Sequence, residues 1–210
     1  MISLEGKSMG LFGTSRKEVW KQLSKEINAS YIEGGYFKGP RIEYKHNIWT
    51  IYLDTYTVST GKSNITYTRM REPFINPKKF FFKVYRKGVF SNIGKALGMQ
   101  DIEIGYDYFD NDYIIKGNNE ILLRRVFQNH KIRDLIEKQS RILLEIKDNE
   151  GRFGPKFKDN ESELFFVSIG LIKDKEKLKN LFELFVQIID EFEMIGITIH
   201  QAPEVKLYKE

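Results

Sequence analysis

The chain has 210 residues, 41% of them hydrophobic and 30% charged, so it can bury a full core as a single domain. It contains no Cys, which excludes disulfides, thiolate metal sites and cysteine nucleophiles, and which fits a reducing compartment. No stretch of about 18 uncharged apolar residues is present and the N-terminus has no signal-peptide core, so we expect a cytoplasmic protein.

Positive charge is concentrated in the first half of the chain. Residues 1–100 hold 17 Lys and Arg against 7 Asp and Glu, whereas residues 101–210 hold 17 against 22. Such a change in net charge along the chain is typical of a molecule with one basic and one acidic surface. The alternative is that the charges of each half only solvate its own surface, since net charge bears on association and not on fold.

The first predicted element is a helix over residues 16–28, with Thr14 or Ser15 as its cap. From Ser30 the hydrophobic period changes to two. Five segments then read as strands: YIEGGYF (31–37), RIEYKH (41–46), WTIYLDTYTV (49–58), NITYTRMREPF (64–74) and KFFFKVYRK (79–87). Their short connections predict an antiparallel meander of all five. In the third strand we expect an inward set of Trp49, Ile51, Leu53 and Tyr56.

After Lys87 the pattern alternates between helices and strands. SNIGKALG (91–98) predicts a short helix, and the acidic residues after it predict a loop. DYIIKG (112–117), RILLEIK (141–147) and ELFFVSIGLI (163–172) read as strands. NEILLRRVFQN (119–129) and KIRDLIEKQ (131–139) read as helices.

Residues 174–196 carry the strongest periodic signal, and Asp174 and Gly196 can cap the helix that they predict. Its apolar residues recur at steps of three and four: Leu178, Leu181, Phe185, Ile188, Phe192 and Ile195. The chain shows no internal repeat. We therefore expect a flexible N-terminal arm over 1–14, a single α+β domain over 15–200, and an extended C-terminal tail over 201–210.

The short sequence motifs give little support to the interpretation that the protein is an enzyme. TGKS at 60–63 lacks the upstream Gly of a phosphate loop, because Tyr56 occupies that position, and a strand follows it instead of a helix. His46, His130 and His200 have no second ligand at metal-binding spacing. We expect no cofactor, no metal and no catalytic residue.

Five acidic residues lie within twelve positions: Asp101, Glu103, Asp107, Asp110 and Asp112. They fail the spacing of a calcium-binding loop, because Ile114 and Ile115 occupy ligand and glycine positions. A hydrolase with paired carboxylates remains an alternative. The favoured interpretation is a solvated rim, anchored to the core by the apolar residues Ile102, Ile104, Tyr106, Phe109, Tyr113 and Ile115.

Basic residues alternate with aromatic ones in PKKFFFKVYRKGVF, and five of them form a candidate anion site: Lys78, Lys79, Lys83, Arg86 and Lys87. On a strand, Lys79, Phe81 and Lys83 would share one face. This face could bind phosphate or an anionic membrane surface, or it could be the charged outer face of an ordinary amphipathic strand.

The strings WTIYLDTY (49–56), TYTRMR (66–71), GMQDIEIG (98–105) and FDNDYIIKGN (109–118) resemble an uncharacterised bacterial protein family with a pleckstrin-homology-like barrel. The resemblance runs from Gly10 to Ile195. It implies a bent antiparallel β-barrel with an N-terminal helix, a helical insertion and a long amphipathic C-terminal helix, and it implies no catalytic residues.

Together these features predict a binding or scaffolding module whose partner is a protein or an anionic ligand. The alternatives are a hydrolase that uses residues 101–112, and peripheral binding to an anionic membrane surface or a phosphorylated ligand through the basic half.

Overall fold

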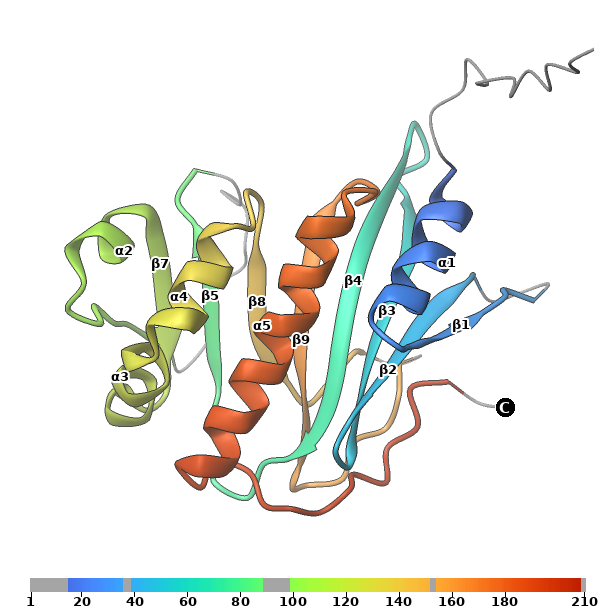
Figure 1. The fold of residues 1–210 in the computed structure, drawn as a ribbon. Coiled ribbons are helices and arrows are strands. Elements are labelled where there is room, and N and C mark those ends of the chain that lie inside the picture. The colour runs from blue at the N-terminus through green and yellow to red at the C-terminus, as the bar shows by residue number, and fades with distance from the viewer. Residues whose placement is uncertain (1–14, 36–38, 89–98, 152–153, 209–210) are drawn as a thin grey trace, which may run out of the picture.

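The computed structural model describes residues 15–35, 39–88, 99–151 and 154–208. These residues form an α+β fold, as the sequence predicts (Figure 1). The helices are α1 (Arg16–Glu26), α2 (Asp107–Asp112), α3 (Glu120–Gln128), α4 (His130–Glu137) and α5 (Lys175–Met194). The strands are β1 (Ser30–Ile32), β2 (Arg41–His46), β3 (Trp49–Ser59), β4 (Asn64–Ile75), β5 (Phe82–Arg86), β6 (Gln100–Asp101), β7 (Tyr113–Gly117), β8 (Leu143–Lys147) and β9 (Glu161–Ile169). The helix predicted over 91–98 and the arm over 1–14 lie outside the described residues.

The nine strands form one antiparallel sheet in the order β1-β2-β3-β4-β9-β8-β5-β7-β6. Within the described residues, the two end strands β1 and β6 do not pair with each other, so the sheet is open. The closed, bent barrel expected from the sequence is therefore wrong for this part of the chain. Helices, and not a second layer of strands, cover the core side of the sheet.

The predicted five-strand meander is correct only for its first four strands. β4 pairs with β3 on one edge and with β9 on the other, where Met70 lies opposite Phe166. β5 pairs instead with β8 and β7. The connection after β4 turns the chain away, because the Asn76 side chain donates to the Phe80 carbonyl and accepts from the Phe80 amide, and Lys79 takes a left-handed φ of 48°.

Helix α5 forms as its sequence predicts. Asp174 accepts a hydrogen bond from the Lys177 amide at 3.1 Å, and Gly196 closes the helix with a φ of 69°. The predicted stripe is buried, with Phe185 and Phe192 fully inaccessible. Figure 1 shows α5 running across one face of the sheet between α1 and α4, and α1, α3 and α4 pack against it.

One contiguous core lies between the sheet and the five helices. Alternate residues of each strand face this core, for example Ile51 and Leu53 of β3 and Met70 and Phe74 of β4. The residues between them face the opposite side, which we call the helix-free face. Tyr56 belongs to the helix-free face, so its assignment to the inward set of β3 is wrong: it lies three positions after Leu53, and side chains an odd number of positions apart on a strand face opposite sides.

Candidate functional site

The structure disperses the five basic residues of the predicted anion site. Lys78 and Lys79 lie in an exposed turn, and the strand begins only at Phe82, so Lys79 does not share a strand face with Lys83. Lys83 forms an ion pair with Glu145 of β8 at 2.7 Å. Arg86 and Lys87 contact the acidic stretch instead.

The acidic stretch contains β6 and α2, so the loop predicted there is only partly correct. Asp110 accepts hydrogen bonds from the amides of Ile104, Gly105 and Tyr106 at 2.8–3.0 Å. Asp112 pairs with Arg86 at 2.8 Å, and Asp101 pairs with Lys116 at 2.7 Å. Glu103 and Asp107 are exposed. The predicted anchors lie in the core, except for Tyr106, which is half-buried against it.

A cleft of about 570 Å³ lies beside this stretch and is lined by Asp101, Glu103, Asp110, Lys87 and Arg124 among others. Two of its carboxylates serve the fold of the loop, because Asp110 accepts from three backbone amides and Asp101 is paired with Lys116. Among the described residues, no group of three or more His, Cys, Asp or Glu side chains could hold a metal ion. In the same part of the chain no helix is long and apolar enough to cross a membrane.

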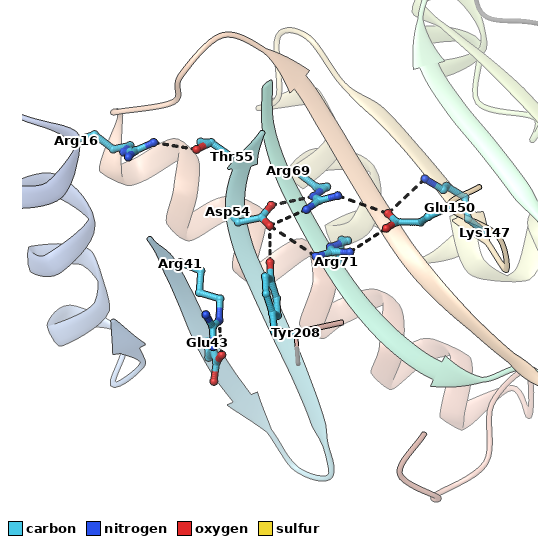
Figure 2. A network of polar contacts seen from close by, with 10 residues as sticks. All are labelled: Arg16, Arg41, Glu43, Asp54, Thr55, Arg69, Arg71, Lys147, Glu150 and Tyr208. Carbon is cyan, nitrogen blue, oxygen red and sulfur yellow. Dashed lines mark hydrogen bonds and ion pairs between the residues drawn. The ribbon is translucent and has the colours of Figure 1, made fainter. Parts of the chain in front are cut away.

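A second set of charged residues converges on the helix-free face, and the sequence analysis did not single it out. We call Asp54, Arg69, Arg71, Lys147 and Glu150 the arginine–carboxylate cluster (Figure 2). Asp54 is on β3, the two arginines are on β4, Lys147 ends β8 and Glu150 follows β8 by three residues. The two arginines lie on the same face because residues two apart on a strand point the same way.

Asp54 holds both arginines. It accepts two hydrogen bonds from Arg69, from Nε at 2.8 Å and from Nη2 at 2.7 Å, and it lies 3.6 Å from Arg71. Burial by itself would raise the pKa of Asp54, but the hydrogen bonds and charges of Arg69 and Arg71 lower this pKa below its ordinary value of 3.8. Asp54 is therefore ionised and is a fixed partner of the two guanidinium groups.

Glu150 is the second carboxylate of the cluster. It lies 3.0 Å from Arg71, 3.6 Å from Arg69 and 3.7 Å from Lys147, so three cations surround one carboxylate (Figure 2). Only the contact with Arg71 has the length of a hydrogen bond. Glu150 is thus held more loosely than Asp54.

Glu163 of β9 lies beside the cluster, opposite Lys147 in the β8–β9 register. It is fully buried, and neither of its carboxyl oxygens accepts a hydrogen bond from the described residues. Burial and the neighbouring Glu150 raise the pKa of Glu163 to about 8. At neutral pH this carboxyl is mostly protonated, so it adds little negative charge to the cluster.

The residues after α5 cross the helix-free face and pack onto it. The amides of Glu204 and Val205 donate to Glu161 at 2.5 and 3.2 Å. The Tyr208 hydroxyl donates to Asp54, and its ring lies 4.3 Å from the Arg41 guanidinium. Burial and the charge of Asp54 raise the pKa of Tyr208, so the hydroxyl stays protonated.

A cleft of about 600 Å³ lies between this segment and strands β2 and β3. We call it the tail cleft. Its lining consists of Arg41, Glu43, Tyr52 and residues 203–208. The rings of Tyr52 and Tyr208 are 5.3 Å apart, and Arg41 pairs with Glu43 at 2.6 Å.

The cluster was missed because its members come from separate parts of the chain. The one local signal is the Arg-x-Arg spacing of residues 69 and 71 within a long strand, which places two charges on one face of the sheet. Nothing in the sequence indicates that Asp54, Glu150 and Tyr208 meet them.

Comparison of the chain with known protein families, with curated protein sequences and with solved structures found no match. The resemblance to a bacterial family with a pleckstrin-homology-like barrel therefore stays a prediction.

Proposed function

We propose that the chain is a cytoplasmic binding module without catalytic activity and that its ligand binds in the tail cleft. The cleft itself is the observation that carries this proposal. Its volume of about 600 Å³ is in the range of small-molecule pockets. It combines the flat rings of Tyr52 and Tyr208 with the polar groups of Arg41 and Glu43, which is the usual mixture of apolar surface and a few orienting groups.

The walls of the cleft also favour binding. One wall is a sheet of paired strands, which holds Arg41 and Tyr52 in place. The other wall is a segment without helix or strand, which hydrogen bonds attach to Glu161 and Asp54. A pocket between a rigid wall and a side-chain-anchored segment suits ligand binding, since binding sites are often built from loops on a rigid scaffold.

The other two candidate functions have weaker support. A hydrolase needs carboxylates that face a substrate, but Asp110 is occupied by three backbone amides and Asp112 by Arg86. A dedicated membrane or phosphate surface on residues 78–87 needs clustered cations, but Lys83 is paired with Glu145, Arg86 is paired with Asp112, and Lys87 donates to the Asp110 carbonyl. Of the five predicted residues, this leaves Lys78 and Lys79, both of which are exposed.

A thermal-shift screen against soluble metabolites tests the proposal, because a ligand that binds only the folded state raises the melting temperature. We expect the compounds that stabilise the parent protein to lose most of their effect on Tyr52→Ala. They should keep it on Lys131→Ala, a matched surface change on α4, where Lys131 pairs with Glu183. Compounds that stabilise all three proteins equally would show that the ligand binds elsewhere.

A further inference from the structure

We propose that Arg69, Arg71 and Lys147 form a binding site for an oxyanion of a ligand, a carboxylate or a phosphate group, and that the Glu150 carboxylate occupies this site when no ligand is bound. None of these four residues lines the tail cleft, although Tyr208 of the cleft contacts Arg71 and Asp54.

The three cations belong to the sheet, whereas Glu150 does not. Arg69 and Arg71 are on β4, and Lys147 is the last residue of β8, with β9 between the two strands. Glu150 lies beyond the end of β8, next to Gly151, which has a left-handed φ of 82°. The binding groups are therefore fixed by strand pairing, while the carboxylate that fills the site comes from the connection between strands.

The charges fixed in the sheet do not balance without an added anion. Among the described residues, Asp54 is the one other carboxylate that pairs with Arg69 and Arg71, and Lys147 pairs with Glu150 alone. The Arg71 side chain is only 3% exposed, so its charge cannot be compensated by water. Without Glu150, the contact of Arg71 with Asp54 at 3.6 Å is its one remaining ion pair among the described residues, so an anion from Glu150 or from a ligand stabilises the buried guanidinium.

The two carboxylates of the cluster differ in how well they fit. Asp54 makes two short bonds to Arg69, at 2.7 and 2.8 Å, as in a bidentate pair. Glu150 reaches only Arg71 within hydrogen-bond distance and stays 3.6 and 3.7 Å from the other two cations. An oxyanion that is free to settle among the three cations can shorten all of these contacts, which gives it an advantage over Glu150.

Glu163 supplies a fourth group to this site. It is fully buried beside Glu150, and its oxygens accept no hydrogen bond from the described residues. In its protonated form it can donate to whichever oxyanion lies among the cations. An anion site with three cations and one neutral donor suits a carboxylate or phosphate, both of which accept several hydrogen bonds.

The test is a calorimetric titration with two probes, inorganic phosphate and acetate, at constant ionic strength set with sodium chloride. It is run at about pH 6, below the pKa of about 8 of Glu163. The variants are Glu150→Gln, which removes the negative charge that competes for the site, and the matched control Glu183→Gln, which removes another paired carboxylate on α5. Stronger binding of phosphate than of acetate identifies a phosphate-bearing ligand, and the reverse identifies a carboxylate.

We expect saturable binding to the parent protein, about tenfold tighter binding to Glu150→Gln because its internal competitor is gone, and parent-like binding to Glu183→Gln. Adding Lys147→Ala to Glu150→Gln should abolish the gain. The proposal is overturned if neither probe binds the parent protein, if Glu150→Gln gains nothing, or if the double variant binds as tightly. Should Glu150→Gln fail to fold, weaker binding to Lys147→Ala than to the parent protein supports the site and equal binding overturns it.

Discussion

Replacing Glu72 by Gln should remove a pH dependence from the stability of the protein. Glu72 lies on β4 between Met70 and Phe74, opposite Leu164 of β9, on the side of the sheet that the helices cover. It is fully buried, and neither oxygen has a hydrogen-bond partner among the described residues. Burial, and with it the charge of Asp190 on α5, raises the pKa of Glu72 well above its ordinary value of 4.5.

The sign of the effect follows from the protons that each state binds. Below pH 4.5 the folded and unfolded chains both carry this proton. Above it the unfolded chain releases the proton while the folded protein keeps it, so the free energy of unfolding falls by about 1.4 kcal/mol per pH unit until the pH reaches the folded pKa. The free energy of unfolding of the parent protein should therefore fall relative to that of Glu72→Gln as the pH rises above 4.5.

Urea denaturation followed by the fluorescence of the buried Trp20 and Trp49 measures this difference. The quantity to plot is the free energy of unfolding of Glu72→Gln minus that of the parent protein, because the other ionisable residues are common to both. Glu103→Gln, at an exposed position, is the control and should give a flat line. A flat line for Glu72→Gln as well would mean that the carboxyl has a partner or is ionised in the folded state, and the reasoning would be wrong.

Three further changes test other parts of the structure. Phe185→Ala should cost about 3–5 kcal/mol in urea denaturation, because Phe185 is fully buried, whereas Met194→Ala on the exposed side of α5 should cost little; equal effects would mean that the stripe of α5 is not packed. Asp110→Ala should lower the free energy of unfolding by about 1–3 kcal/mol, because it removes three hydrogen bonds from backbone amides. Ca²⁺, Mg²⁺ and Mn²⁺ should leave the melting temperature of the parent protein unchanged. A metal-dependent shift in melting temperature that Asp110→Ala abolishes would instead support a metal site. Sedimentation with anionic vesicles at about 50 mM salt should show weak binding, which Lys79→Glu reduces and about 200 mM salt removes. Lys83→Glu should act mainly on stability, because it breaks the pair with Glu145. Selective loss of vesicle binding with Lys83→Glu would instead support the basic strand as a dedicated site.

The helices α1, α3, α4 and α5 and most strands were predictable from the sequence because their signals are local, whereas α2 was predicted as a loop. Ser15 accepts from the Glu18 amide and Glu18 accepts from the Ser15 amide, a capping box that short-range spacing can show. The stripe of α5 repeats within one helix. The order of the strands is different, because β4 meets β9 through pairs such as Met70 and Phe166, which no local pattern links.

The sequence predicted the structural role of the acidic stretch, but it did not predict the arginine–carboxylate cluster. The acidic stretch reads as a rim from its own apolar residues, and Asp110 shows how the rim is held. The arginine–carboxylate cluster depends instead on strand order, because the order β4-β9-β8 brings Arg71 and Lys147 to the same part of the sheet. A search for charged residues that are neighbours in sequence therefore found Lys78 to Lys87 and missed the residues that meet in space.

The position of β4 has a consequence for the chain as it is synthesised. The first four strands can pair as soon as they leave the ribosome, but the second edge of β4 must wait for residues 161–169. During this interval residues 64–75 offer an unpaired edge, which is a template for pairing with another chain. Arg69, Arg71 and Glu72 place three charges on the two faces of that strand, and charged residues within an exposed strand oppose aggregation. Before they meet Asp54 and Glu150, the two arginines thus oppose pairing of the unfinished sheet with another chain.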